Sequence, residues 1–485
     1  MLTIATEIFR EYDIRGQYPL KLNETLTRLI GKALGSEILL ANQQYCFVAW
    51  DGRHSSPSLR DALISGICST GCHVKLIGAT ATANAFWAIK QDNQSCAMIT
   101  GSHNPKQDNG IKIAVAGSPR SGEDIQVLLS RIQLELFSVG HGRVEDASHL
   151  MEDYQQRLTQ DLHLQRPLKV VLDAGNGIGG PIARKALRTI GAHVSEIACE
   201  VDGDFPLHHP DPAKTKNLKW LKEAVMNEGA DLGIALDGDA DRIGVIDNLG
   251  QVILPDRLSL LFIRDILLRQ RAVKQETLKL KDSKQSALIQ QSLKQDTILF
   301  DVKCTDQLQH YVHQFGGSPM MIATGHTSMK RAIKQTNALF ATELSGHILF
   351  NDELGLGVDD GIYAGLRLCQ LLAEQTEPLS TLMGQFPQPF STEEIQVTVK
   401  DSEKFSIMSL IQHHAFINHD TCTIDGIRVQ LENGWALVRA SNTTPCLTLR
   451  FEALNEISLN NNMDLMSKEL NKLLPNLKLD LKAHY

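Results

Sequence analysis

Three aspartates stand at alternating positions in the segment Asp237-Gly238-Asp239-Ala240-Asp241-Arg242. A loop that curls at its small residues brings the three carboxylates onto one cation. Such hard oxygen ligands suit Mg²⁺ or Ca²⁺. An EF-hand is excluded, because glycine is not the sixth residue of the segment and glutamate is not the twelfth. A solvated acidic turn is the alternative. The apolar run 232–236 before the segment favours a metal site, because it places the carboxylates at the ligand-binding edge of a sheet.

A second segment, Thr100-Gly101-Ser102-His103-Asn104-Pro105, follows the apolar run 97–99. Its serine, between a glycine and a histidine after a strand, is a candidate nucleophile. The flanking glycines of a G-x-S-x-G nucleophile elbow are missing, which argues against a hydrolase triad. Because Gly, Ser, Asn and Pro all favour turns, this segment taken alone fits an ordinary turn better.

Two further loops carry side chains that suit a phosphorylated sugar. The segment 439–445 combines a guanidinium, hydroxyls and an amide, which are the donors that a phosphate dianion needs. The segment 343–347 supplies a carboxylate, a hydroxyl and an imidazole, which suit sugar hydroxyls. His326 lies in another polar turn and Lys303 follows an apolar strand, and a single histidine or lysine in such a place is more often structural than functional.

Short apolar runs typical of strands alternate with amphipathic stretches typical of helices over most of the chain. This β-α-β order predicts parallel or mixed sheets. Each strand ends at polar or glycine-rich residues, so the candidate loops are expected where open α/β sheets bind ligands. The expected strands that carry this argument are 46–50, 74–78, 169–173, 232–236 and 298–302, and the expected helices between them are 58–70 and 182–190.

The chain is expected to contain several domains, since a single hydrophobic core stops growing at roughly 250–300 residues and this chain has 485. The repeated strand and helix pattern, and its change after about residue 387, predict four. We expect three similar α/β domains with mixed sheets and a smaller C-terminal α+β domain, with the active site in the central cleft. The predicted ranges are 1–150, 151–251, 252–386 and 387–485. The Lys- and Gln-rich stretch 269–296 is expected to be a solvated surface helix or insertion.

Composition and charge exclude several classes of protein. The formal net charge is −8, and an acidic surface argues against nucleic acid as the main partner. Apolar runs stay well short of the roughly 20 residues of a membrane span, and the N-terminus does not resemble a secretory signal. Nine scattered cysteines without a C-x-x-C pair argue against a disulfide framework or a zinc site, so a cytoplasmic location is expected.

The motifs together resemble those of the α-D-phosphohexomutase superfamily, specifically its bacterial phosphomannomutase/phosphoglucomutase branch. They occur in the family's order and span nearly the whole chain. Two departures are Thr342, where the branch usually has glycine, and Leu344, where it often has methionine. The matching motifs are FREYDIRG (9–16), TGSHNP (100–105), NGIK (109–112), DGDADR (237–242), FDVKCT (300–305), TGHT (324–327), ELSGH (343–347) and RASNTTP (439–445).

The resemblance implies roles for particular residues. Ser102 is expected to carry a phosphoryl group and, with Asp237, Asp239 and Asp241, to bind Mg²⁺, while Arg242 lies against the phosphoserine. Three unranked candidates for proton transfer and transition-state charge are Arg15, His103 and Lys112. The sugar hydroxyls are expected to contact Glu343, Ser345, Gly346 and His347. The non-reacting phosphate is expected to bind Arg439, Ala440, Ser441, Asn442 and Thr443, with help from Tyr12, Lys303, His326 and Arg450.

The implied reaction interconverts hexose 6-phosphate and hexose 1-phosphate, for mannose and also for glucose. Phospho-Ser102 would pass its phosphoryl group to the sugar, and the resulting 1,6-bisphosphate would turn around and return the other one. Mg²⁺ is the expected cofactor, and glucose or mannose 1,6-bisphosphate the activator. Phosphoglucosamine mutase is the alternative, against which Leu344 argues, because those enzymes usually have glutamine there. A non-catalytic binding protein is disfavoured because Ser102 and the aspartates are all present. We expect a monomer, with a dimer as the alternative.

Overall fold

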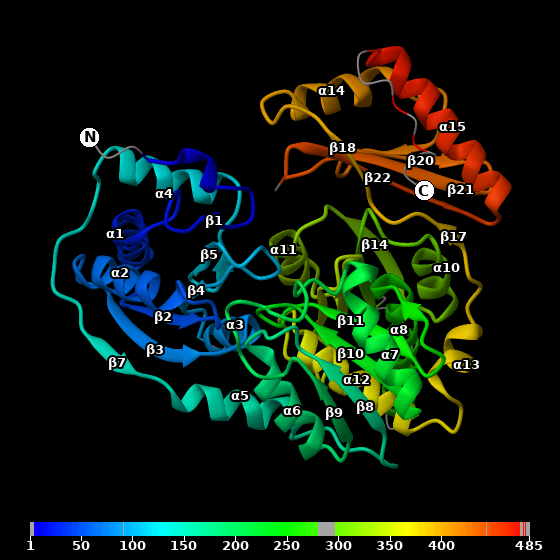
Figure 1. The fold of residues 1–485 in the computed structure, drawn as a ribbon, viewed down its shortest axis with the longest axis horizontal. Coiled ribbons are helices and arrows are strands. Elements are labelled where there is room, and N and C mark those ends of the chain that lie inside the picture. Colours follow the sequence, from blue (N-terminus) through cyan, green and yellow to red (C-terminus); the bar gives the residue numbers. More distant parts are fainter. Residues whose placement is uncertain are drawn as a thin grey trace.

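The computed structural model describes residues 4–90, 92–279, 296–442 and 444–475, with 479 and 481, and the side chains of 276–279 are outside it. Within these residues the strands form four sheets (Figure 1). The second sheet includes residues 252–253, just beyond the predicted boundary at 251. None of the described helices combines the length and apolar character needed to cross a membrane.

The first sheet has the strand order β1-β5-β4-β2-β3-β7, with β6 paired to β5. Strands β2, β3 and β4 are parallel, and β5 is antiparallel to β4. Both faces of β2 are buried: Cys46 and Val48 pack with α1, α2 and α4, whereas Phe47 and Ala49 pack with α3. The elements are η1 (Thr6–Ile8), β1 (Ile14–Gln17), α1 (Glu24–Leu40), β2 (Tyr45–Trp50), α2 (Ser56–Cys68), β3 (His73–Ala79), α3 (Thr82–Lys90), β4 (Ser95–Ile99), β5 (Asp108–Val115), β6 (Ser118–Pro119), α4 (Glu123–Gln133) and β7 (Val144–Asp146).

The second sheet has the order β12-β11-β10-β8-β9, in which β10, β8 and β9 are parallel and β11 is antiparallel to β10. The predicted strands 169–173 and 232–236 coincide with β8 and β10. Its elements are α5 (His149–Thr159), β8 (Lys169–Asp173), α6 (Gly179–Thr189), β9 (His193–Ile197), η2 (Thr215–Leu218), α7 (Lys219–Glu228), β10 (Leu232–Leu236), β11 (Ile243–Asp247) and β12 (Val252–Ile253).

The third sheet has the order β14-β13-β15-β16, again with the last strand antiparallel to its neighbour. Residues 269–279 of the predicted insertion continue helix α8, and 280–295 lie outside the described residues. The elements are α8 (Pro255–Lys279), β13 (Thr297–Asp301), α10 (Gln307–Gln314), β14 (Ser318–Ile322), α11 (His326–Thr336), β15 (Phe340–Thr342), β16 (Ile348–Phe350), α12 (Gly361–Ala373) and α13 (Leu379–Gly384).

The first three sheets therefore repeat one design. The orders β3-β2-β4-β5, β9-β8-β10-β11 and β14-β13-β15-β16 are equivalent, with three parallel strands followed by one antiparallel strand. This repetition matches the prediction of three similar α/β domains with mixed sheets. It also means that corresponding turns occur in all three domains.

The fourth domain has a sheet dominated by antiparallel pairs, of order β17-β22-β21-β20-β19 with β18 also paired to β22. Its apolar side chains form a core of their own with α14 and α15, whereas one continuous core runs through the first three domains. The elements are β17 (Phe390–Ser391), β18 (Ile395–Thr398), α14 (Lys404–His414), β19 (Thr421–Cys422), β20 (Ile427–Leu431), β21 (Gly434–Ala440), β22 (Cys446–Ala453) and α15 (Glu456–Leu473).

Candidate active site

Corresponding turns of the three α/β domains meet at the centre of the molecule. The loop between the third strand and the antiparallel fourth strand carries 100–107 in the first domain, 237–242 in the second and 343–347 in the third. An isolated bridge joins Arg242 to His347. A Cβ atom at Gly238 would lie 2.5 Å from the Ser102 carbonyl oxygen, so this glycine permits the close approach of the first two loops.

The carboxylates of Asp237, Asp239 and Asp241 are fully buried and present oxygens within 4.8 Å of one another. The Lys112 ammonium lies 2.7 Å from Asp239 Oδ2 and 2.5 Å from Asp241 Oδ2. Burial and the charge of Asp239 raise the pKa of Asp237 well above its usual range. Burial acts in the same direction on Asp239, but Lys112 outweighs it and holds that pKa well below its usual range.

The same cluster fits a divalent cation. Asp239 Oδ1 and Asp241 Oδ1 are buried and have no hydrogen-bond partner within the described part of the chain. A buried carboxylate oxygen without a partner is costly, and a cation would remove that cost. Three carboxylates also form the hard oxygen set that Mg²⁺ prefers.

Ser102 faces this cluster. Its hydroxyl donates to Asp237 Oδ2 at 2.7 Å and lies 3.1 Å from His103 Nδ1. The residue is 1% exposed, and its φ of 49° is in the left-handed region. A left-handed serine is uncommon and is held by its surroundings.

Positive charge surrounds the serine loop. Arg15 donates to Asp13 Oδ2 at 2.7 Å, to Asn104 Oδ1 at 2.8 Å and to the Gly101 carbonyl at 3.3 Å. Burial lowers the pKa of His103 well below its usual range, and the nearby charges of Arg242 and Arg15 add to the effect. His103 is therefore neutral near pH 7.

Arg242 and His347 form a chain of contacts that leads away from the metal loop. Arg242 Nε donates to His347 Nε2 at 3.0 Å, and His347 Nδ1 lies 3.2 Å from Asp359 Oδ2. Lys330 Nζ lies 2.7 Å from Asp359 Oδ1. Burial raises the pKa of Asp359, but Lys330 and His347 outweigh burial and hold it far below its usual range. Asp359 is therefore ionised.

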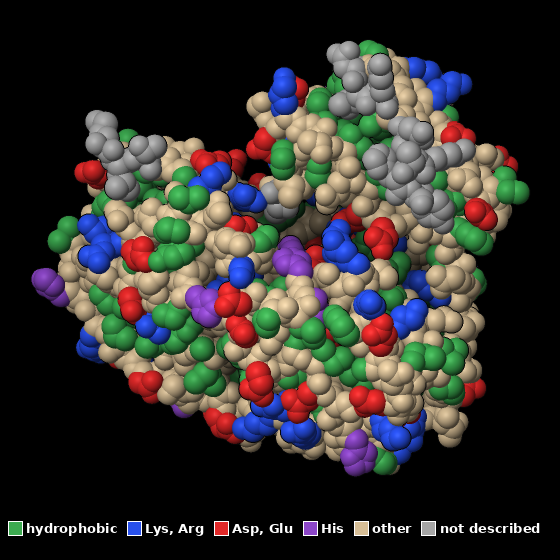
Figure 2. Space-filling view, in the orientation of Figure 1, with side chains coloured by type: hydrophobic (Ala, Val, Ile, Leu, Met, Phe, Trp, Pro, Cys, Tyr) green, Lys and Arg blue, Asp and Glu red, His purple; other side chains and the backbone are tan. Residues whose placement is uncertain are grey.

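A cavity of about 450 Å³ opens beside these loops and is lined by all four domains. Figure 2 shows a hollow at the centre of this face, below the fourth domain. Predicted site residues that line the cavity are Tyr12, Arg15, His103, Arg242, Lys303, His326, Glu343, Ser345, His347, Arg439, Ser441, Asn442 and Arg450.

Loops of the first, third and fourth domains also contact one another where they line the cavity. The Tyr12 hydroxyl donates to the Thr324 carbonyl at 2.7 Å and accepts from Asn442 Nδ2 at 2.5 Å. Arg439 Nε lies 2.9 Å from Asp425 Oδ2, and the same carboxylate oxygen accepts from the Thr324 backbone N–H. These contacts join three domains at the cavity.

Several predicted substrate-binding residues lie outside the cavity or take part in structural contacts. Ala440 is buried on β21 and is not among the described residues that line the cavity. Gly346 has a φ of 97°, and a Cβ there would lie 2.7 Å from the Ile243 carbonyl oxygen, so its role is to shape the loop. Arg450 lines the cavity but is only 1% exposed and pairs with Asp256 at 3.2 Å. Thr443 lies outside the described residues.

Comparison with known proteins agrees with this architecture. Four domain families of phosphoglucomutase/phosphomannomutase match the chain. They are alpha/beta/alpha domain I over residues 6–137, domain II over 151–250, domain III over 283–390 and the C-terminal domain over 394–462. A phosphomannomutase/phosphoglucomutase of Pseudomonas putida is 40% identical over 478 residues, which cover 98% of each chain. The chain belongs to the phosphoglucomutase/phosphomannomutase family.

Two further relatives set the family context. A phosphoglucomutase/phosphomannomutase family protein of Burkholderia thailandensis has a solved structure with a TM-score of 0.88 and 35% identity, covering 98% of this chain and 99% of that one. A probable phosphoglucosamine mutase of Methanosarcina barkeri is more distant, at 29% identity over 460 residues, covering 93% of this chain and 96% of that one.

Sequence reasoning missed several charged residues that support this family site. Asp359 and Lys330 lie behind His347, Asp425 lies behind Arg439, and Glu394 lies 2.8 Å from Lys303 Nζ. None of them falls within the motifs quoted above. The two successive aspartates before α12 were a usable signal for Asp359. One aspartate is enough to cap a helix, and Asp360 does so here, which leaves Asp359 for another role.

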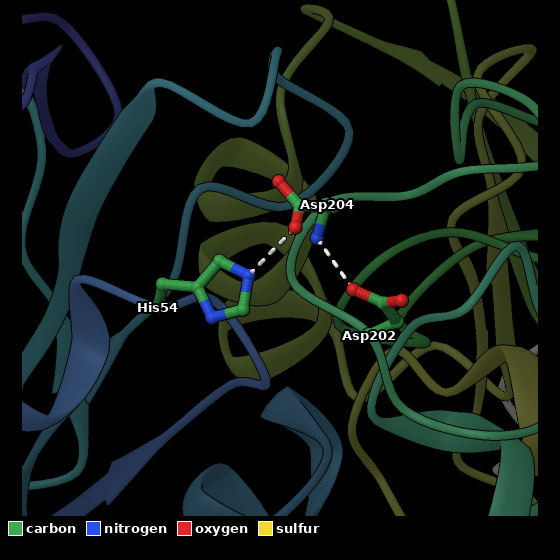
Figure 3. Close-up of side chains that lie close together, drawn as sticks. All are labelled: His54, Asp202 and Asp204. Carbon is green, nitrogen blue, oxygen red and sulfur yellow. Dashed lines mark hydrogen bonds and ion pairs between the residues drawn. The ribbon is translucent and has the colours of Figure 1, made fainter.

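A second group of possible metal ligands lies at the surface between the first two domains (Figure 3). His54 Nε2 lies 3.3 Å from Asp204 Oδ2, and the Asp204 backbone N–H donates to Asp202 Oδ1 at 2.9 Å. The side chains of His54 and Asp204 are 70% and 56% exposed, and Lys106 also pairs with Asp204. We interpret this group as solvated polar contacts between domains, in which Lys106 and Asp204 form the ion pair.

Proposed function

We propose that this chain interconverts hexose 6-phosphate and hexose 1-phosphate, for mannose and glucose, with Ser102 as the phosphoryl carrier. One observation carries the proposal. The Ser102 hydroxyl lies in a cluster of three buried carboxylates, beside a cavity that residues of all four domains line. A serine in that place can hold a phosphoryl group against a cation on one side and a sugar on the other.

Phosphoryl transfer begins from phospho-Ser102. A free hydroxyl of the bound hexose phosphate attacks the phosphorus, the bond to Ser102 Oγ breaks, and a 1,6-bisphosphate forms while the serine oxygen takes up a proton. After the bisphosphate turns around, Ser102 attacks the other phosphoryl group and the product is released. Catalysis of this kind rests on alignment and on neutralising the phosphoryl oxygens.

The protonation state of each residue near Ser102 determines whether it can neutralise the phosphoryl group or accept a proton. Arg15 and Lys112 remain protonated, because the carboxylates beside them outweigh burial and raise their pKa. They supply positive charge near the phosphoryl group. His103 is neutral because its pKa is lowered by burial, so it can accept the proton of the attacking hydroxyl. His326 and His347 are two further imidazoles that line the cavity.

Asp237, Asp239 and Asp241, with an oxygen on Ser102, would hold Mg²⁺. When bound, the ion supplies positive charge to the oxygens of the phosphoryl group. We further propose that glucose or mannose 1,6-bisphosphate activates the enzyme by phosphorylating Ser102.

The remaining loops bind the sugar and its second phosphate. Glu343 and Ser345 offer a carboxylate and a hydroxyl to the sugar, and Ser345 donates to Glu343 Oε2 at 3.2 Å. Arg439 and Asn442 are the phosphate donors of the fourth domain. Because the bisphosphate must bind in two orientations, this phosphate pocket has to accept either end of the sugar. Ser102 is only 1% exposed, and this burial limits the access of water to the phosphoserine.

Leu344 supports mannose and glucose over glucosamine as the sugar. It lines the cavity and packs against the continuous core of the first three domains. An apolar side chain offers no hydrogen bond to an amino group. The more distant relation to a probable phosphoglucosamine mutase agrees with this preference.

Two measurements test the proposal. Intact-mass analysis of active protein should show one phosphoryl group, located on Ser102 by peptide mapping. Ser102→Ala should lose turnover of mannose 1-phosphate and glucose 1-phosphate in the presence of catalytic glucose 1,6-bisphosphate. Ser130→Ala, an exposed serine on α4, is the matched control and should keep full turnover. Normal turnover by Ser102→Ala would disprove the role of this serine.

A further inference from the structure

Arg53 is a buried arginine that the motifs do not include. It stands in the segment Asp51-Gly52-Arg53 between β2 and α2, and its side chain is 1% exposed. Among the described residues, it is not one of those that line the cavity. A guanidinium in this position therefore needs an explanation other than substrate binding.

All five N–H groups of the Arg53 guanidinium have acceptors. Three of these acceptors are backbone carbonyls of the serine loop 100–107, and a fourth is the carbonyl of Asp108, the first residue of β5. One terminal nitrogen donates to the carbonyls of Pro105 at 2.7 Å and Asp108 at 2.9 Å. The other donates to the carbonyls of Ser102 and Asn104, both at 2.7 Å. Nε lies 3.2 Å from Asp51 Oδ2. Only a planar fork with five donors can make this set of bonds.

Asp51 holds the other side of the same loop. Its Oδ2 accepts from the Gly101 backbone N–H at 3.2 Å, and its Oδ1 accepts from the Arg53 backbone N–H at 3.1 Å and from Ser56 Oγ at 2.6 Å. The pair of side chains thus fixes the backbone on both sides of Ser102. The ring of Phe205, from the second domain, lies 5.0 Å from the guanidinium carbon and covers it.

The repeated fold supplies an internal comparison. Strands β8 and β13 take the place of β2 in the second and third sheets, and they end at Asp173 and Asp301. Each of these aspartates accepts from the backbone N–H two residues later, as Asp51 does. The residues at that second position are Gly175 and Lys303, so an arginine follows the aspartate only in the domain that carries the serine.

We infer that Arg53 is a positioning residue for phosphoryl transfer, a role that rests on the proposed function of Ser102. Ser102 has left-handed backbone geometry and its carbonyl points to Arg53, while its hydroxyl points to Asp237. By holding three loop carbonyls and that of Asp108, Arg53 keeps this backbone conformation and thereby aims the hydroxyl at the carboxylate cluster. Arg53 acts on the loop and not on the sugar.

The test uses Arg53→Lys and Gly101→Ala in the full-length protein with Mg²⁺ and glucose 1,6-bisphosphate. Lysine keeps the charge but cannot bridge four carbonyls. A Cβ atom on Gly101 would lie 2.5 Å from the Arg53 guanidinium carbon, so this variant disturbs the arrangement without removing the cation. Because misplacement of about 1 Å can cost about 100-fold, kcat should fall by about that factor in each variant. KM for the hexose phosphate should stay within about threefold.

Three readouts separate positioning from general destabilisation. Hydrogen exchange of peptides that cover 101–108 should accelerate while the peptides of β2 and β4 keep their protection. The kcat of the double variant should be no lower than that of the less active single variant, since both changes break one arrangement. Arg60→Lys on α2, whose guanidinium contacts Asp61 and the Trp50 ring, is the matched control and should keep kcat.

Folded Arg53→Lys protein with kcat within threefold of the natural protein, and with unchanged exchange over 101–108, would overturn the inference. If the natural protein does not turn over hexose phosphates at all, the proposed function fails instead. The exchange experiment still decides whether Arg53 holds the loop in that case.

Discussion

Replacing Asp360 by asparagine is expected to change how the stability of the third domain depends on pH. Asp360 is fully buried at the start of α12, where its Oδ2 accepts from the Tyr154 hydroxyl at 2.6 Å and its Oδ1 accepts from the Tyr363 backbone N–H at 3.0 Å. Burial raises the pKa of Asp360 to about 7, from 3.8 for an ordinary aspartate, although these hydrogen bonds act in the opposite direction. The folded protein therefore holds this proton more tightly than the unfolded chain does.

The magnitude follows from linkage. Between pH 3.8 and about 7 the folded state binds one more proton than the unfolded state, so the free energy of unfolding falls as pH rises. The slope is about 1.4 kcal/mol per pH unit. In Asp360→Asn the amide oxygen still accepts from the Tyr363 backbone N–H and caps the helix, and the amide nitrogen donates to the Tyr154 hydroxyl oxygen, as the O–H of the neutral acid would. The free energy of unfolding of the variant, minus that of the natural protein, should therefore be about 3 kcal/mol larger at pH 8 than at pH 5.

Cys369 offers a local probe for this measurement. It is a fully buried thiol on α12, so pulsed alkylation in urea, read by peptide mass spectrometry, reports unfolding of that helix. Glu374→Gln removes one negative charge at the exposed end of the same helix and serves as the control. An equal stability difference between Asp360→Asn and the natural protein at pH 5 and pH 8 would refute the reasoning.

Three more variants test the site. Lys112→Met should lower the free energy of unfolding by about 3–5 kcal/mol in EDTA, because two buried carboxylates lose their cation, and Mg²⁺ should restore more stability to the variant than it adds to the natural protein. Asp359→Asn should reduce kcat by about 100-fold with little change in KM, since His347 loses the carboxylate that orients it; kcat within threefold in steady-state assays contradicts this. Arg439→Lys should raise KM for glucose 1-phosphate by about 10-fold or more while the fold is kept, because lysine loses the planar fork that suits phosphate; an unchanged KM argues against phosphate binding by this loop.

The sequence alone determined the strands and the loops that carry the chemistry. Strands β8 and β10 have the expected bounds because a fully buried strand is a short apolar run, and polar or glycine residues mark its end. The Ser102 loop and the aspartate loop were found because local spacing and the family motifs identify them. These signals depend on neighbours in the chain, which a sequence displays directly.

Only the tertiary structure decided which charged groups meet across the site. Lys112 reaches carboxylates that are 127 and 129 residues away, and Asp359, just before helix α12, contacts His347 on the loop 343–347. The Arg53 bonds go to backbone carbonyls, which every residue has, so side-chain patterns could not reveal them. The Lys112 contacts arise when the first two domains pack together, and the Arg53 and Asp359 contacts arise when separate loops of one domain meet. The spacing of residues along the chain carries little information about either kind.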